Sequence, residues 1–167
     1  MWAVMITLLK GGVSQLAVIY FPLSDQLYFA ERDQGSTLNG KPIRVSDHTD
    51  FQTGRGLVYR SNYHSVYGEK VKEYEKIVAK IATETNIKML NYSCICAVAM
   101  VANGGMDFAI ANAGLDWDQL PINLLLTEAG AIMTHVEGKP WKRGRQDYIA
   151  ASPVLHKQIM KFVQDAV

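Results

Sequence analysis

The sequence has few cysteines and no long apolar run. Its two cysteines, Cys94 and Cys96, lie two residues apart, and side chains at that spacing on a helix point to different faces and do not easily form a disulfide. We expect them to be small core residues in a reducing compartment. No apolar segment approaches the roughly 20 residues that span a bilayer, and the N-terminus lacks the charged region of a signal peptide. These absences predict a cytoplasmic protein without a membrane anchor.

An excess of charge of one sign is also missing. Seventeen basic residues stand against 16 acidic ones, for a net charge of +1. The chain therefore has no long-range field to attract nucleic acid or an anionic membrane, and we expect neither partner. Histidine is scarce, with no i, i+4 pair and no nearby cysteine cluster, which argues against a zinc site and predicts surface positions. The four histidines are His48, His64, His135 and His156.

Two common catalytic and phosphate-binding motifs are absent as well. Neither Ser61 nor Ser65 lies in a Gly-x-Ser-x-Gly context, and the Gly11-Gly12 and Gly104-Gly105 pairs are not followed by Lys-Ser or Lys-Thr. The glycine pairs therefore indicate turns. At 167 residues, with 49% hydrophobic and 20% charged residues, the chain is long enough for one domain, residues 1–167, with its own core.

The first part of the chain predicts antiparallel sheet. Residues 2–9 are rich in β-branched and large apolar side chains, and residues 16–21 return as a hairpin partner after Lys10-Gly11-Gly12. Residues 26–31 form a third strand, and the Asn39-Gly40 turn precedes residues 43–45. The pattern indicates a meander of about four strands.

The second part predicts alternating helix and strand. Strands are expected at 57–59, 87–90, 106–111, 131–134 and 148–151, and helices at 71–81, 94–101, 119–129 and 156–163. The predicted fold class is α/β in the mixed α+β sense, with layered sheets and helices. The antiparallel meander would be a separate sheet or an extension of the second one.

The most informative segment is Leu115-Asp116-Trp117-Asp118, which opens a strongly apolar helix. At a helix start, a carboxylate meets free backbone N–H groups and the positive end of the helix dipole. Aspartate is a preferred N-cap residue, and Pro121 in a first turn would cost no hydrogen bond. Local pattern therefore favours a helix cap, and the alternative is a metal ligand.

Trp117-Asp118 is followed nine residues later by Thr127-Glu128-Ala129-Gly130. Together they resemble the C-terminal signature of the inositol monophosphatase family of metal-dependent sugar phosphatases. The resemblance implies that Asp118 both caps the helix and binds a catalytic metal, Mg²⁺.

The resemblance covers nearly the whole chain. Residues 2–9, 17–22, 27–31 and 38–46 are similar, in order and spacing, to the segments that follow the family's main metal loop. That loop, Asp-Pro-(Ile/Leu)-Asp-Gly-Thr, and a metal-binding glutamate upstream of it have no counterpart after Met1. The chain therefore resembles the C-terminal half of such a phosphatase.

The missing carboxylates limit the chemistry that the resemblance implies. Phosphomonoester hydrolysis of this class needs two or three divalent ions held by several carboxylates, and Asp118 would supply a ligand to only one. Mg²⁺ binding is therefore expected to be weak. Asp116 would be a second metal ligand if it formed an Asp-Trp-Asp pair with Asp118. The family has no ligand at this position, and the alternative is that Asp116 is a solvated loop carboxylate. Asp107 is expected in a turn or at a strand edge.

A gapless count back from Asp118 places Tyr92-Ser93-Cys94 at the family's Gly-(Ser/Thr)-Ala segment near the substrate. Ser93 matches, Cys94 is expected beside it in the substrate site, and Tyr92 would reshape the pocket where the family has glycine. Ala111 stands where inositol-specific members have a glutamate that accepts hydrogen bonds from substrate hydroxyls. That contact is lost, which disfavours myo-inositol monophosphate as the preferred substrate.

Two functions follow from the resemblance. The first is a Mg²⁺-dependent phosphomonoester hydrolase acting on a small phosphorylated metabolite, of which this chain would be a fragment that is inactive alone. The alternative is a non-catalytic truncated homologue that acts as a folded interaction module; an unrelated α/β binding protein would require a coincidence of motif order. Related families hydrolyse inositol phosphate, nucleoside bisphosphate, sugar bisphosphate or histidinol phosphate.

Because residues 2–9 lack their family neighbours, we also expect a homodimer.

Overall fold

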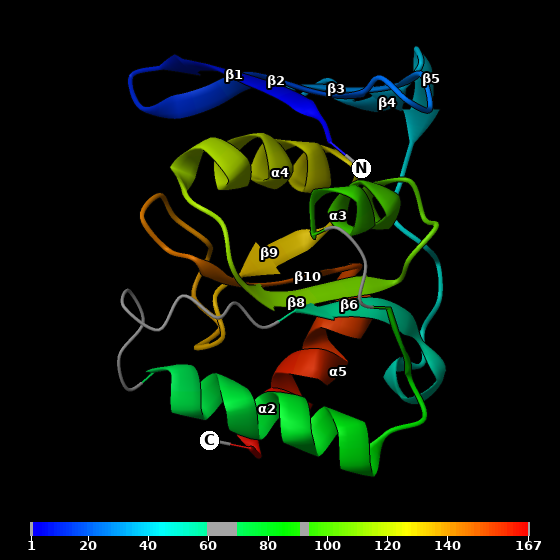
Figure 1. Ribbon diagram of the computed structural model, residues 1–167, viewed down its shortest axis with the longest axis vertical. Coiled ribbons are helices and arrows are strands. Elements are labelled where there is room, and N and C mark those ends of the chain that lie inside the picture. The colour runs from blue at the N-terminus through cyan, green and yellow to red at the C-terminus, as the bar shows by residue number, and fades with distance from the viewer. Residues whose placement is uncertain (1, 60–69, 91–93, 167) are drawn as a thin grey trace.

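Two β-sheets and two helical layers alternate through the molecule (Figure 1). The computed structural model describes residues 2–59, 70–90 and 94–166. The elements in chain order are β1 (Val4–Lys10), β2 (Val13–Phe21), β3 (Gln26–Glu31), β4 (Gly35–Leu38), β5 (Lys41–Ile43), a 3₁₀ helix η1 (Phe51–Thr53), β6 (Arg55–Tyr59), α2 (Lys70–Glu84), β7 (Lys88–Leu90), α3 (Cys94–Ala102), β8 (Phe108–Asn112), α4 (Asp116–Glu128), β9 (Ile132–Thr134), β10 (Asp147–Ala151) and α5 (Pro153–Gln164). The layered mixed α/β class expected from the sequence is confirmed.

The first sheet is an antiparallel meander in the order β1-β2-β3-β4-β5, separate from the second sheet. It has one strand more than expected, because β4 was not recognised in the short polar run Gly35–Leu38. Strand β4 pairs with β3 over its full length. Asn39 and Gly40 then turn the chain back into β5 with φ angles of 49° and 77°, the positive values that a type I′ hairpin turn requires.

The inner face of the first sheet packs on α4 and contributes to the main core. Ile19, Phe21 and Tyr28 point inward and are buried. The alternate residues of β1, namely Val4, Ile6 and Leu8, are exposed, because successive side chains of a strand point to opposite faces. In the part of the chain that the structure describes, no helix lies above this outer face (Figure 1).

The second sheet is mixed, in the order β7-β6-β8-β10-β9. Strand β6 runs parallel to β7 and β8, and β10 runs antiparallel to β8 and β9. Helices α3 and α4 cover one face, and α2 and α5 cover the other (Figure 1). All five residues of β8 are buried as a result. The neighbouring strand β6 has a glycine at position 56, because a Cβ there would lie 2.5 Å from the Phe108 ring of β8.

The signature helix α4 begins earlier than the sequence predicted. It starts at Asp116, and Leu115 rather than Asp118 is the N-cap residue, so the prediction that Asp118 occupies the N-cap position was wrong. Asp118 is the third helical residue, and its side chain accepts the Leu115 N–H. The cause is Gly114, whose φ of +94° turns the chain before the helix. Pro121 is consequently the sixth helical residue, and it lacks the N–H that would bond to the Trp117 carbonyl in a regular helix.

Two of the four histidines do not lie on the surface as expected. His135 and His156 are both buried. His156 lies on the inner stripe of α5, where its Nε2 is 2.9 Å from the Thr134 hydroxyl, so burial follows from the helical period. His48 is half-buried, and His64 lies outside the described residues.

Cys94 and Cys96 are free thiols. Among the described residues, no helix combines the length and apolar character that crossing a bilayer would require.

Candidate functional site

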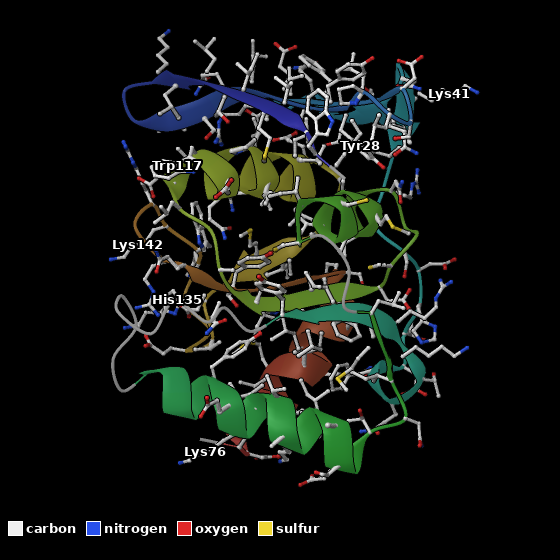
Figure 2. The ribbon with its side chains drawn as sticks, viewed as in Figure 1. Tyr28, Lys41, Lys76, Trp117, His135 and Lys142 are labelled. Carbon is white, nitrogen blue, oxygen red and sulfur yellow. The ribbon has the colours of Figure 1, made fainter. Side chains whose placement is uncertain are left out.

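Asp118 lies in the first turn of α4, at one end of the helix (Figure 1). Its backbone N–H donates to the Leu115 carbonyl at 2.9 Å, and its Oδ2 accepts the Leu115 N–H at 3.2 Å. The carboxylate is half-exposed. Trp117 beside it is 69% exposed and points away from the core (Figure 2). Asp118 therefore uses one oxygen to hold the helix start, and among the described residues no hydrogen bond to the other oxygen is found.

The turn before α4 is built by a glycine and a buried amide. A Cβ at Gly114 would lie 2.7 Å from Nε2 of Gln119, so only glycine fits this approach. The same Nε2 donates to the Ala113 carbonyl. The Oε1 atom of Gln119 is buried without a partner among the described residues. The position of Asp118 is thus fixed by local backbone geometry.

Cys94 opens α3 and faces Tyr148 on β10. The thiol sulfur and the phenol oxygen are 3.3 Å apart. Burial raises the pKa of Cys94, and the hydrogen bond to Tyr148 offsets part of that rise. Burial, and then the neighbouring Cys94, raises the pKa of Tyr148 well above its ordinary value of 10.0. Both groups are therefore neutral at physiological pH, and Asp118 is close enough to contribute to both shifts.

Ala111 is fully buried near the end of β8. It is paired with Tyr59 on one side and Tyr148 on the other, and directly paired residues point to the same face of a sheet. The Tyr74 hydroxyl donates to the backbone of the same region and lies 2.8 Å from the carbonyls of both Tyr59 and Ile110. Ala111 has only a methyl group, so aromatic side chains flank a position that has no hydrogen-bonding group.

Asp116 is engaged in a structural contact. Its Oδ2 accepts Nε of Arg143, and its Oδ1 accepts the Gly144 N–H at 2.9 Å. These bonds hold the pKa of Asp116 below its ordinary value, with the Arg143 contact as the main cause. The carboxylate therefore joins the start of α4 to the loop between β9 and β10, which argues against its use as a metal ligand.

The described residues bring only part of the expected site together. The charge of Asp118 contributes to the raised pKa of Cys94, and Ala111 is paired with Tyr148, which contacts Cys94. Ser93 and Tyr92 lie outside the described residues. Within residues 2–59, 70–90 and 94–166, no three His, Cys, Asp or Glu side chains are grouped so as to hold a metal ion.

Glu128, the acidic residue of the second signature segment, has a structural role that the sequence did not reveal. Its two carboxylate oxygens accept the backbone N–H groups of Asp33 and Gly35 at 3.0 and 2.9 Å. The Leu125 carbonyl nearby accepts the Ser36 hydroxyl at 2.8 Å. The end of α4 is thereby fastened to the turn between β3 and β4. Residues 89 to 95 positions apart make these bonds, and no local pattern predicts them.

Asp107 was expected in a turn or at a strand edge, and it does lie in the turn just before β8. Its near-complete burial was not foreseen. The carboxylate accepts the Ser46 hydroxyl at 2.6 Å and the Arg55 N–H at 2.7 Å, with Arg55 Nε 3.6 Å away. The three groups satisfy this buried charge and tie the segment after β5 to the second sheet.

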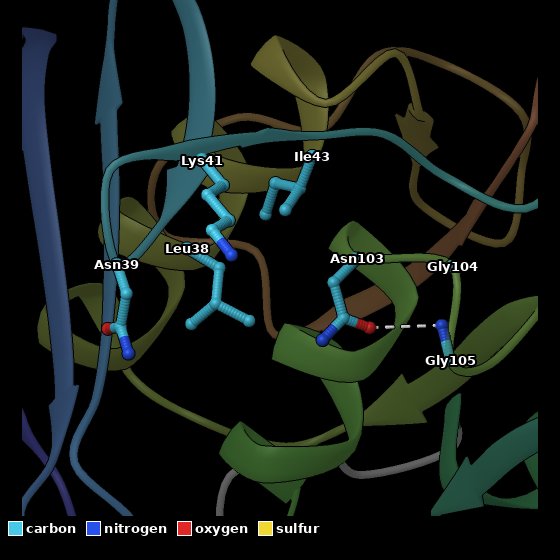
Figure 3. Close-up of a pocket in the computed structure, with 7 residues that line it drawn as sticks. All are labelled: Leu38, Asn39, Lys41, Ile43, Asn103, Gly104 and Gly105. Atoms are coloured by element: carbon cyan, nitrogen blue, oxygen red, sulfur yellow. Dashed lines mark hydrogen bonds between the residues drawn. The ribbon is translucent and has the colours of Figure 1, made fainter.

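A separate hollow of about 550 Å³ lies between the β4–β5 turn and the end of α3 (Figure 3). Lys41 is the only charged residue among the described residues that line it. The Asn103 side chain accepts the Gly105 N–H and donates to the Tyr28 hydroxyl, both at 2.9 Å. Asn39 likewise bonds to backbone groups. Because its amides are used internally, the hollow does not present a convergent set of polar groups to a ligand.

Known proteins resemble this chain over its whole length. The sequence profile of the inositol monophosphatase family matches residues 1–167. The chain belongs to the inositol monophosphatase family. Among curated relatives, an Aquifex aeolicus protein named fructose-1,6-bisphosphatase/inositol-1-monophosphatase is 29% identical over 160 residues, which are 96% of this chain and 58% of that protein. The Mesorhizobium japonicum inositol-1-monophosphatase is 28% identical over 98% of this chain and 60% of its own length.

Solved structures of family members have the same fold. The inositol monophosphatase from Anabaena superimposes with a TM-score of 0.84 at 26% identity, over 99% of this chain and 64% of that one. The suhB protein of Bartonella henselae gives a TM-score of 0.86 at 22% identity, over 99% and 62%. The chain thus spans about 60% of the length of the relatives that it matches.

Proposed function

We propose that this chain supplies one metal ligand and part of the substrate side of a Mg²⁺-dependent phosphomonoester hydrolase of the inositol monophosphatase type, and that it does not hydrolyse phosphate esters by itself. The observation that carries the proposal is the isolation of Asp118. Among the described residues, one of its carboxylate oxygens has no hydrogen-bond partner, while Asp116 is bound to Arg143 and Gly144. No cluster of metal-binding side chains surrounds it among the described residues.

The described residues therefore do not fit a catalytic magnesium site. Mg²⁺ prefers six oxygen ligands in octahedral geometry, and a single carboxylate leaves five of them to water. Such an ion would bind weakly and would not be held beside a phosphate. The relatives, whose names state phosphatase activity, are longer than this chain by about two thirds, and the remaining ligands would have to come from the part without a counterpart here.

The substrate of this proposal is a small phosphorylated metabolite, bound by Ser93 and by Cys94, the residue that opens α3. One solved relative is described as SaIMPase-II with bound inositol monophosphate. In this chain Ala111 offers no acceptor for an inositol hydroxyl, and its neighbours are Tyr59 and Tyr148. A different phosphate ester is therefore favoured. The proposal includes one domain over residues 1–167, a cytoplasmic location and a homodimer.

A second function, a folded interaction module without catalysis, is favoured by one observation. Several relatives are named Nus factor SuhB, among them the Escherichia coli protein at 27% identity over 98% of this chain, and that name states no hydrolytic reaction. A chain with one available carboxylate and an intact fold is consistent with such a role.

A fusion experiment separates the two functions. The segment of the Aquifex aeolicus relative that has no counterpart in this chain would be joined to it, and hydrolysis of inositol 1-phosphate and p-nitrophenyl phosphate would be measured with excess Mg²⁺. The hydrolase proposal expects turnover by the fusion that Asp118→Asn abolishes, and none by the chain alone. Turnover by the chain alone, or a folded fusion without turnover, would contradict it.

A further inference from the structure

We propose that the loop between β9 and β10 positions Asp118 from outside its helix, through the contact of Arg143 and Gly144 with Asp116. Arg143 is therefore a positioning residue that acts on Asp118 only through Asp116. The importance of Asp118 rests on the proposed function, whereas the contact itself lies within the described residues and can be measured without turnover.

The first turn of α4 is weakly attached to the rest of the helix. Leu115 at the N-cap position has no side-chain oxygen to accept the free N–H groups of the turn. Pro121 lacks the N–H that would bond to the Trp117 carbonyl, and Trp117 itself is exposed. Helix ends with such features open readily. Asp118, the third helical residue, therefore depends on contacts outside the helix for a fixed position.

Asp116 supplies such a contact on the exposed side of the turn. Its two carboxylate oxygens accept Nε of Arg143 and the N–H of Gly144, where the loop after β9 lies beside the start of α4 (Figure 1). Asp116 and Asp118 belong to the same helical turn, so holding the first residue restricts the backbone that carries the second. On the buried side, the Gln119 side chain bonds to the backbone that precedes the helix. The turn is thereby held on both sides.

The loop that supplies these donors is itself anchored to the second sheet. The Arg145 N–H donates to the Lys142 carbonyl at 3.1 Å and closes a turn. Within this turn Gly144 has a φ of +83°, which favours glycine. The Arg145 guanidinium donates to the two carboxylate oxygens of Asp147 at 3.0 and 3.1 Å, and Asp147 is the first residue of β10. The donors to Asp116 therefore extend from a fixed base.

Pairing with Arg143 also neutralises a charge close to the candidate site. An unpaired Asp116 would place a second negative charge in the turn of Asp118 and would repel the anionic phosphate ester of the proposed function. The side chains of Arg143 and Asp116 are 60% and 29% exposed, so solvent screening limits the strength of the pair. The contact is thus suited to orienting the turn more than to stabilising the whole fold.

Amide hydrogen exchange of the chain tests the contact directly. The N–H groups of Leu115 and Asp118 make bonds of the first turn, and their exchange reports its opening. We expect Arg143→Ala to speed exchange at both amides by about threefold to fivefold, with no change at Ile110 in the buried strand β8. The matched control is Lys142→Ala, which removes an exposed cation from the same turn and should leave both amides unchanged.

A double-mutant cycle tests whether Arg143 acts through Asp116. Asp116→Ala should speed the same exchange, and adding Arg143→Ala should change it no further. Three results would overturn the proposal: unchanged exchange in Arg143→Ala, an equal effect of Lys142→Ala, or additive effects of the two substitutions in the cycle.

The fusion described for the proposed function gives a second readout. Arg143→Ala in the fusion should raise the Mg²⁺ concentration that gives half-maximal rate by about threefold or more and change kcat by less than about twofold, because the ligand is less well positioned. Lys142→Ala should change neither value. An active fusion whose Mg²⁺ dependence is the same in Arg143→Ala would overturn the positioning role. A folded fusion without turnover would contradict the hydrolase proposal instead, and the exchange measurements would still decide whether the contact holds the turn.

Discussion

The phenol of Tyr148 on β10 and the thiol of Cys94 at the start of α3 lie 3.3 Å apart in the interior of the candidate site. Their contact joins the second sheet to the helix that precedes β8. It also brings a hydroxyl to the region where Ala111 has none, since Tyr148 and Ala111 are paired across the strands.

Removing the hydroxyl of Tyr148 should make Cys94 less reactive. The hydrogen bond from Tyr148 lowers the pKa of Cys94 against the larger effect of burial, so Tyr148→Phe should raise that pKa and reduce the thiolate fraction at a given pH. We also expect a loss of about 1 kcal/mol in the free energy of unfolding. Iodoacetamide alkylation against pH, in a Cys96→Ala background, measures the effect. Faster alkylation of Tyr148→Phe would contradict the assignment.

Glu128 should contribute to stability through the two N–H groups that it accepts. Glu128→Ala leaves the backbone donors of Asp33 and Gly35 without their partner, and we expect a loss of about 2 kcal/mol in urea unfolding. Glu84→Ala is the matched control, because that carboxylate is exposed and pairs with Lys80 at 3.8 Å within one helix; such surface pairs contribute well under about 1 kcal/mol. Equal losses for the two variants would contradict the role given to Glu128.

The buried histidines should make stability depend on pH. Burial lowers the pKa of both His135 and His156 from the ordinary 6.5, so the unfolded chain binds protons more readily than the folded one. Stability should be fully present above pH 6.5 and fall as the pH drops below it, toward the folded pKa values. His156→Gln should make this dependence shallower between pH 7 and 5.5. Identical slopes for this variant and the unaltered chain in urea unfolding would refute the assignment.

The sequence predicted those parts of the fold that depend on local pattern. Large apolar and β-branched residues together with the Gly11-Gly12 turn predicted the β1–β2 hairpin. The 3.6-residue period predicted α2, and α3 was expected as a short buried helix. Strand β4 was missed because four residues with two small polar side chains have no strand pattern of their own; the pairing with β3 makes them a strand.

The site was predictable only where a motif specified it. The signature placed Asp118 at the start of α4, but Gly114 moved the helix start and made Leu115 the N-cap residue. The roles of Glu128 and Asp107 arise from bonds between distant segments. Short-range periodicity does not contain that information.

Direct measurement of Mg²⁺ binding tests the central claim that Asp118 is an isolated ligand. The account predicts no saturable binding in calorimetric titration and no rise of several degrees in the melting temperature at about 1 mM Mg²⁺, because an ion that barely binds the folded state adds little stability. Asp118→Ala should behave like the unaltered chain. Saturable binding with a micromolar dissociation constant that disappears in Asp118→Ala would contradict the account, since it would mean that other side chains complete a metal site around Asp118.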